Sequence, residues 1–204
     1  FNPHISPEDV RRVKKSYAIV SDYILYLSTL KPSKNVEGLV EAFGLLKSKN
    51  KIQNTKLVIA GKKGWIYESI LEKVKTLRLG KEVVFTDFVP EKDKAPLIKG
   101  AKVFVLPSFW EGFGLDALNA MACGVPVVVS NVGSLPEVVG DAGILVDPHK
   151  PAYIASGIAK VLSMSDLEYN KLIEKGLGQA EKFSWEGTAR KTIEILEKVK
   201  NGRI

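Results

Sequence analysis

The sequence predicts one α/β domain in which a parallel sheet is covered by helices on both faces. Two observations lead to this prediction. Short apolar runs without polar alternation recur between residues 23 and 146, and such runs are typical of strands buried on both faces. Most runs are followed by a longer segment with apolar residues three and four positions apart, which is the spacing of an amphipathic helix. Strands that alternate with helices in this way predict a doubly wound, Rossmann-like sheet.

Apolar runs and the breaks between them predict about six strands, with helices in the intervening segments and a helical C-terminal tail. Ser6-Pro7-Glu8-Asp9 has the order of a helix start: a capping serine, a proline at the first helical position and acids in the first turn. This first helix is expected to end near Ala18. We expect strands at 23–28, 56–60, 83–86, 102–106, 126–130 and 143–146. The later helices are expected at 35–49, 66–79, 92–100, 115–123, as one turn at 134–139, and as three helices from Pro151 onward.

Composition limits the class of protein. A chain of 204 residues with 45% hydrophobic and 26% charged residues is ordinary for one globular domain. The sequence has no apolar run of the about 18 to 20 residues that a membrane helix needs, and no signal peptide. The single cysteine, Cys123, excludes an internal disulfide and fits a reducing compartment. We therefore expect a cytoplasmic protein.

The charge balance does not identify a partner. Lysine and arginine total 30 against 23 acidic residues, which gives a net charge of +7. A basic balance can indicate nucleic acid, anionic lipid or a phosphorylated ligand. The lysines are spread along the expected helices, and the aromatic signatures of RNA-binding domains are absent. We expect no nucleic acid partner and, because no metal-ligand spacing occurs, no metal site.

Residues 107–126 carry the strongest functional signal. The strand at 102–106 leads into a loop with one carboxylate, Glu111, beside Gly112 and Gly114. Glycine has no Cβ, so a ligand can approach the backbone there. The first N–H groups of the next helix lack helical partners and can hold an anion, usually a phosphate. Glu111 could then accept hydrogen bonds from hydroxyl groups beside that phosphate, a combination that predicts a nucleotide-linked sugar.

Several motifs occur in a fixed order along nearly the whole chain. In combination they resemble the C-terminal domain of retaining GT-B glycosyltransferases of group 1, the family that includes glycogen synthases and lipid-linked mannosyltransferases. The motifs are the Tyr-Leu-Ser-Thr-Leu run at 26–30, Lys34-Asn35, the Glu111 loop, Leu-Pro-Glu-Val-Val at 135–139 and Gly-Ile-Leu-Val-Asp-Pro at 143–148. The resemblance implies that residues 1–204 form the nucleotide-sugar-binding half of a two-domain enzyme. Residues 1–5 would be the remnant of the interdomain linker.

The resemblance also implies an activity. The donor would be a nucleoside-diphosphate sugar, and its hexose would be transferred with retained configuration and without a metal or other cofactor. The acceptor, a saccharide or a lipid-linked saccharide, would be held by the protein's own N-terminal domain across the cleft. This half alone is expected to be inactive. A peripheral position on the cytosolic membrane face is compatible with these expectations.

Two departures from the family pattern concern the donor. The family has two glutamates separated by seven residues: Glu111 matches the first, which contacts the donor sugar, and Asn119 stands where the second would bind ribose hydroxyls. Asparagine keeps one carbonyl acceptor but lacks the charge. Lys34 matches the lysine on the diphosphate, whereas Thr29 stands where many members have an arginine. Lys34 is therefore expected to be the main cation at the diphosphate. The resemblance thus implies that Glu111 and Lys34 are the catalytic residues.

Other donor contacts are implied more generally. Phe113, Gly114 and Leu115 would offer backbone N–H groups to the sugar or phosphates, and Val89 would contact the nucleobase through its backbone. Gly133 and Ser134 would lie near the phosphates. Two alternatives stay open for the neighbouring aromatic residues, which could line the cleft or only pack beneath loops. These aromatic residues are Trp65, Phe109 and Trp110.

Two other functions are alternatives to this one. The same fold could belong to a sugar-nucleotide epimerase or to a binding module that has lost catalysis, and Asn119 is the best support for that alternative. A dinucleotide-dependent oxidoreductase would need Gly-x-Gly-x-x-Gly after the first strand. Residues 28–35 contain no glycine, so the sequence argues against that class.

Overall fold

The computed structural model describes residues 1–49 and 52–202 and has the predicted α/β fold. All strand pairings are parallel, and the strand order is β3-β2-β1-β4-β5-β6. The chain therefore reverses its direction of winding between β1 and β4, and the carboxyl ends of these two strands are neighbours. This switch point is where such sheets bind ligands. The strands are β1 (Asp22–Leu27), β2 (Thr55–Ala60), β3 (Val83–Asp87), β4 (Val103–Leu106), β5 (Val127–Ser130) and β6 (Ile144–Val146).

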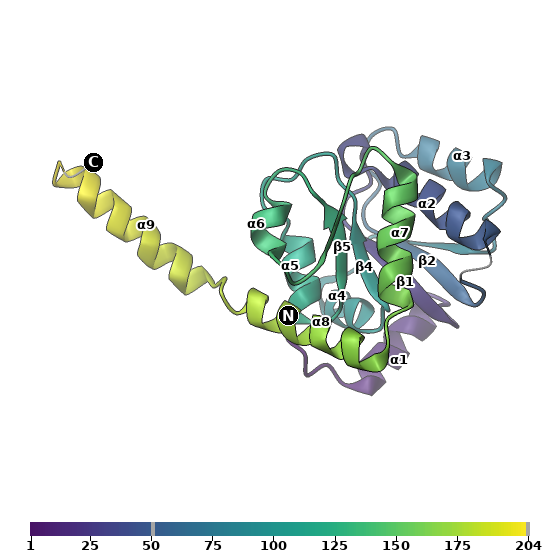
Figure 1. Ribbon diagram of the computed structural model, residues 1–204, viewed down its shortest axis with the longest axis horizontal. Helices are drawn as coiled ribbons and strands as arrows, with labels where there is room; N and C mark the ends of the chain where they lie inside the picture. The colour runs from purple at the N-terminus through teal and green to yellow at the C-terminus, as the bar shows by residue number, and fades with distance from the viewer. Residues whose placement is uncertain (50–51, 203–204) are drawn as a thin grey trace.

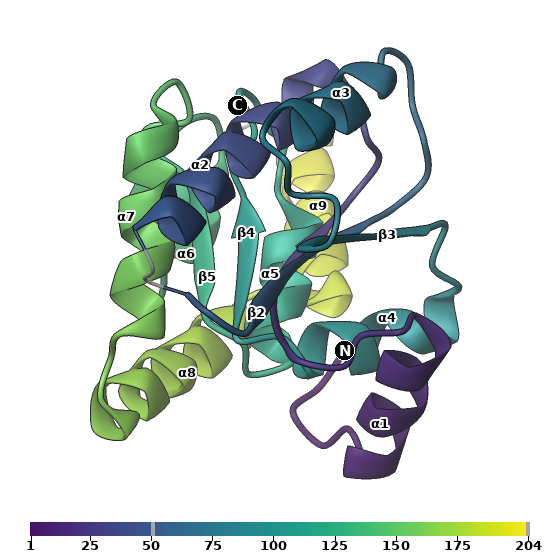
Figure 2. The same ribbon diagram turned by 90° about the vertical axis from the view of Figure 1, so that its right-hand side faces the viewer.

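Helices cover both faces of the sheet (Figures 1 and 2). α2, α3 and α7 pack together on one face, while α1, α4, α5 and α8 form a contiguous layer on the other. The helices are α1 (Pro7–Ser16), α2 (Val36–Ser48), α3 (Glu68–Thr76), α4 (Glu91–Lys99), α5 (Leu115–Ala122), α6 (Leu135–Val139), α7 (Pro151–Leu162), α8 (Asp166–Ala180) and α9 (Trp185–Lys200).

Local signals in the sequence set several helix boundaries. The Ser6 side chain accepts a hydrogen bond from the Asp9 N–H at 3.0 Å, so α1 begins where predicted. Ser165 and Glu168 form a reciprocal capping box at the start of α8. α3 begins at Glu68, two residues later than expected, because Ile66 has a left-handed φ of 59° that a helix cannot include.

The core is formed by the central strands and the helix faces that cover them. Every residue of β4 and β5 is buried, as expected for central parallel strands. Two tyrosines of β1 are fully buried, and their hydroxyls donate to backbone oxygens: Tyr23 to Leu97 at 2.6 Å and Tyr26 to Thr29 at 3.1 Å. These partners are necessary because a buried hydroxyl without a hydrogen bond is costly. The rigid sheet gives the loops at its carboxyl edge fixed starting points.

α9 differs from the other helices. It extends away from the sheet and its covering layers (Figure 1), and none of its residues is buried. Trp185 and Leu196 are among its exposed apolar side chains. Within residues 1–49 and 52–202, we find no helix that is both long and apolar enough to cross a membrane.

Candidate functional site

Three loops meet at the carboxyl edge of the sheet beside the switch point, and Asn35 ties them together. Its buried side chain donates from Nδ2 to the carbonyl oxygens of Pro107 at 3.0 Å and of Pro148 at 2.7 Å. Asn35 has a left-handed φ of 54°, a conformation that asparagine adopts more readily than most residues. Gly38 makes room for it, because a Cβ at that position would lie 2.4 Å from Asn35 Oδ1. The residue before Asn35 is therefore held in place.

Lys34 and Glu111, the two residues predicted to be catalytic, are in contact. Lys34 closes a short 3-10 helix, η1 (Pro32–Lys34), which the sequence did not predict. Its Nζ lies 2.5 Å from Glu111 Oε1, and the two side chains are only 12% and 10% exposed. Phe109 N–H donates to the carbonyl oxygen of Ser33 at 2.9 Å, which joins the Glu111 loop to η1. A partly buried, charge-assisted pair of this kind is among the stronger polar contacts in proteins.

Two buried serines, which the sequence analysis missed, support the Glu111 loop. Ser108 Oγ donates to Glu111 Oε1 at 2.7 Å, and Ser130 Oγ donates to the Ser108 carbonyl oxygen at 2.6 Å. Both serines are 0% exposed. The sequence signal that could have identified these serines was their position at the ends of strands. Ser130 ends β5, and Ser108 follows β4 by two residues. These hydrogen bonds fix the loop to the two central strands and orient the Glu111 carboxylate.

Gly114 and Gly133, both predicted to contact the donor, have left-handed φ angles that allow the backbone to turn here. Gly114 has a φ of 96°, and a Cβ on it would lie 2.5 Å from Leu135 Cδ2. Gly133 has a φ of 60°, and its Cβ would lie 2.7 Å from the Glu111 carbonyl oxygen. Ser134 Oγ donates to the same oxygen at 3.1 Å. Gly133 and Ser134 therefore lie against the Glu111 backbone, whereas Gly112 is exposed.

The first turn of α5 begins directly after this loop. Gly114 is its N-cap, and no described side chain caps the helix, so its first N–H groups can meet an anion. Asp116, which the sequence analysis did not single out, lies in this turn. Burial raises the pKa of the Asp116 carboxyl; a hydrogen bond from Ser28 and the charge of Lys34 oppose this shift. This turn therefore combines open amide groups with an incompletely solvated carboxylate.

Phe113, Leu115 and Asn119, three of the residues predicted to contact the donor, line a surface hollow that we call the α5 groove. It has a volume of about 530 Å³, and the residues described around it do not include Lys34 or Glu111. Phe113 packs edge-to-face on Phe183 there, with ring centroids 5.6 Å apart. The groove is lined by Phe1, Asn2, Pro3, Phe113, Leu115, Leu118, Asn119, Ala122, Leu177, Ala180, Glu181, Phe183, Ser184, Trp185 and Thr188.

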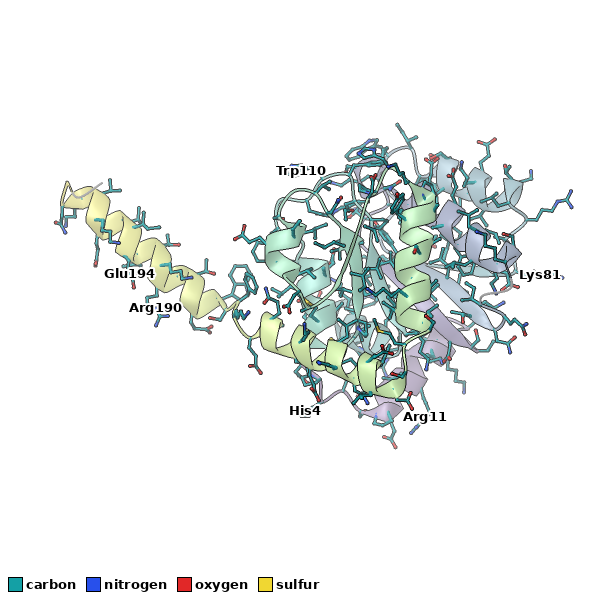
Figure 3. All side chains as sticks on the ribbon, in the orientation of Figure 1. His4, Arg11, Lys81, Trp110, Arg190 and Glu194 are labelled. Atoms are coloured by element: carbon teal, nitrogen blue, oxygen red, sulfur yellow. The ribbon has the colours of Figure 1, made fainter. Side chains whose placement is uncertain are left out.

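The remaining predicted contacts lie at the edges of the site. The Val89 side chain is buried in the core, and the contact of its backbone with the nucleobase stays a prediction. Thr29 follows β1, and its carbonyl oxygen accepts the Tyr26 hydroxyl. Trp65 is 62% exposed, with Lys31 Nζ 5.7 Å from its ring centroid. Trp110 is 67% exposed at the rim formed by the strand ends, opposite His4 (Figure 3).

Phe109 adds a further aromatic contact at this rim. Its ring stacks on His149 with centroids 5.0 Å apart, so Phe109 is only partly free to contact a ligand. Within residues 1–49 and 52–202 there is no group of three His, Cys, Asp or Glu residues arranged to hold a metal ion.

The sequence also matches a known family. Residues 11–178 match the profile of the family described as glycosyl transferases group 1. This match covers most of the chain, and the chain therefore belongs to that family. The predicted family and the predicted fold class are both confirmed.

Named relatives agree with this assignment. The chain is 39% identical over 190 residues to O-antigen chain mannosyltransferase B of Escherichia coli, a match that covers 92% of the chain and 49% of that enzyme. It is 35% identical over 203 residues to an uncharacterized glycosyltransferase of Methanocaldococcus jannaschii, covering 97% of the chain and 50% of that protein. The chain thus spans about half the length of these curated relatives.

Solved structures share the fold. Sucrose-phosphate synthase from Thermosynechococcus elongatus superposes with a TM-score of 0.82 at 27% identity, over 99% of the chain and 50% of that enzyme. Anabaena HepE, solved with UDP and glucose, gives a TM-score of 0.83 at 20% identity over 97% of the chain and 55% of HepE. At that identity, the HepE match shows the fold alone.

Proposed function

We propose that this chain binds the nucleoside-diphosphate sugar for a glycosyltransferase that transfers a hexose with retained configuration. The Lys34–Glu111 pair beside the uncapped first turn of α5 is the observation that carries the proposal. It sets a cation, a carboxylate and open amide groups side by side at the switch point. Diphosphate and sugar hydroxyls are the chemical groups that such a set recognises.

A bound nucleotide sugar could replace the contact between Lys34 and Glu111 without leaving either charge unpartnered. A diphosphate would take over the Lys34 ammonium, and a sugar hydroxyl would donate to the Glu111 carboxylate. Among the described residues, the two hydrogen bonds to the Glu111 carboxylate both reach Oε1. Oε2 accepts neither of these two bonds, so this oxygen can accept a hydroxyl while Ser108 continues to orient the group.

The reaction would break the bond between the sugar C1 and the β-phosphate oxygen and form a bond from C1 to an acceptor hydroxyl oxygen. The acceptor proton is released, and the nucleoside diphosphate leaves. Lys34 and the amides of α5 would stabilise the negative charge that develops on the departing phosphate, with no metal needed for that task. The acceptor, a saccharide or lipid-linked saccharide, would be supplied by an N-terminal domain of the full-length protein.

Mannose is the first sugar to test, because relatives at 39% and 36% identity are mannosyltransferases. The nucleobase of the donor has to be determined by experiment. UDP is the first reference, since HepE, which shares the fold, has been solved with UDP-glucose.

A calorimetric panel of UDP, GDP and ADP sugars tests the proposal on this chain. We expect one member to bind, and Lys34→Met to weaken that binding about 10- to 100-fold because a charge-assisted contact is lost. Lys160→Met, on the exposed part of α7, is the matched control and should bind like the wild type. If no nucleotide sugar or nucleoside diphosphate binds the folded wild type, the proposal is wrong.

A further inference from the structure

Asn35 occupies a helix start, but its side chain does not cap that helix. The residue is both the C-cap of η1 and the N-cap of α2. An asparagine at an N-cap usually accepts a hydrogen bond from a backbone N–H in the first helical turn. Among the residues that the structure describes, the Asn35 side chain makes no such capping bond. Its amide donates instead to two carbonyl oxygens that lie 72 and 113 positions further along the chain.

The two carbonyl oxygens belong to the other two loops of the site. Pro107 directly follows β4 and begins the Glu111 loop, while Pro148 lies between β6 and α7. These two loops also touch each other, because the Phe109 ring stacks on His149. The contacts among the three loops form a closed ring, which we call the loop clamp. It consists of Ser33, Asn35, Pro107, Phe109, Pro148 and His149.

The loop clamp sets the relative position of Lys34 and Glu111. Lys34 directly precedes Asn35 in the chain. Glu111 follows Phe109 by two residues. The planar amide of Asn35 points its two hydrogens in fixed directions, so it also fixes where the two accepting carbonyl oxygens lie. Because Asn35 is only 7% exposed, its loss would leave these oxygens without a ready substitute from water. The backbone on both sides of the Lys34–Glu111 contact therefore depends on one side chain.

We propose that Asn35 is a positioning residue of the donor site, which acts by holding Lys34 at the diphosphate in register with the Glu111 loop. The inference rests on the proposed function, because the position of Lys34 matters only if Lys34 meets the diphosphate. Binding and catalytic groups are sensitive to such displacement, since a shift of about 1 Å can lower a rate about 100-fold. The expected effect of Asn35 is therefore on ligand binding as well as on stability.

Asn35→Gly tests this role, because glycine accepts the left-handed backbone and only the side chain is removed. The probe is whichever of UDP, GDP and ADP binds wild type most tightly by calorimetry. We expect Asn35→Gly to bind it about tenfold more weakly, since a charge-assisted contact is displaced. Gln179→Ala is the matched control: Gln179 is also a buried amide, and it donates to the Val138 carbonyl oxygen at 3.0 Å. Both variants should lose stability, but Gln179→Ala should bind like wild type.

A double-mutant cycle separates positioning from general support of the fold. If Asn35 acts through Lys34, Asn35→Gly should change binding little in the Lys34→Met background. NMR titration measures the weaker binding of these two variants. An equal fold-loss in both backgrounds, or unchanged binding by folded Asn35→Gly, overturns the inference and leaves the proposed function standing. If folded wild type binds none of the three nucleoside diphosphates, the proposed function itself fails.

Gly38→Ala displaces the Asn35 side chain without replacing it, and it takes the place of Asn35→Gly should that variant not fold. A Cβ at position 38 would lie 2.4 Å from Asn35 Oδ1, whereas alanine itself favours the helix. We expect the same loss of binding, again dependent on Lys34. Gly176→Ala in α8 is the matched control, because its Cβ would come no closer than 3.6 Å to Met121. Wild-type affinity in folded Gly38→Ala would overturn the inference.

Discussion

The two sides of α5 offer a ligand very different surroundings. At its first turn, the helix meets a closed polar cluster in which Lys34, Glu111 and Ser108 are joined by short hydrogen bonds and largely removed from water. Along its outer side runs the α5 groove, whose lining is mostly apolar and includes Phe113, Leu118 and Trp185. Because electrostatic contacts are stronger where water is excluded, we propose that the chemistry takes place on the first side.

The comparison also separates two residues that the sequence motif joins. Glu111 lies in the polar cluster, whereas Asn119, eight positions later, faces the groove. In the polar cluster, a charged carboxylate is expected to contribute much to ligand binding. In the α5 groove, an uncharged amide is better suited to the apolar lining. Four experiments test whether the two sides of α5 differ in this way.

Glu111→Ala should nearly abolish sugar transfer by the full-length protein. Removal of a group that stabilises the transition state typically lowers kcat about 100- to 1000-fold. The free energy of unfolding should also fall by about 1 to 3 kcal/mol, because Lys34 loses its partner in a mostly buried position. Turnover assays and denaturant unfolding measure the two effects. Glu111→Gln is the control, since it keeps the shape but not the charge; a near-normal rate in either variant would contradict the assignment.

Ser108→Ala should have an intermediate effect that acts through Glu111. The change removes the 2.7 Å hydrogen bond that orients Oε1, and the free energy of unfolding should fall by about 1 kcal/mol. Transfer should fall severalfold while the affinity for nucleoside diphosphate alone changes little. Ser108→Thr, which restores a hydroxyl, should recover part of the rate. An equal loss of affinity and rate would show that the loop as a whole is damaged.

The pH dependence of stability should reveal Asp116, whose pKa is raised by burial in the first turn of α5. The folded-state pKa of Asp116 lies above its unfolded value, so the folded protein holds the proton more tightly, and this residue lowers stability as pH rises through that range. Asp116→Asn should therefore be more stable than wild type at pH 7, and the difference should shrink toward acidic pH. Urea unfolding at several pH values measures this difference in stability. A difference that does not change with pH would contradict the prediction. The groups that shift this pKa, besides burial, are Ser28, Lys34, Glu111 and Lys94.

Asn119→Glu should produce the smallest change. If the side chain at position 119 reaches the ribose, the added charge should strengthen nucleotide binding about threefold. This is a fraction of the usual gain from a charged acceptor. The groove explains this small value, because its apolar lining desolvates the new carboxylate. Calorimetry with the nucleoside diphosphate measures the effect. A tenfold gain would show that the groove side of α5 is as important for the nucleotide as the polar cluster.

The fold could be predicted from the sequence because its signals are local. Apolar runs and helical spacing identified all six strands and the helices between them. Capping residues such as Ser6 set helix starts through contacts three residues apart. The errors were small and had local causes, such as the left-handed Ile66 before α3 and the unpredicted turn η1.

The candidate site could be predicted only in part. Lys34 and Glu111 were chosen by sequence, but their contact spans 77 positions along the chain. It exists because the strand order places the ends of β1 and β4 side by side. Ser108 and Ser130 were missed because a serine after a buried strand has no distinctive pattern until its partners are known.

Local signals were therefore sufficient to predict the order of the elements, the family, and the residue types that could meet a phosphate and a sugar. The packing of the sheet and its loops decided which of those residues lie together. The fold joins Lys34 to Glu111 and places Asn119 in the α5 groove. The physical reason is that periodicity and capping act over a few residues, whereas burial and charge pairing depend on neighbours that only the packed sheet brings together.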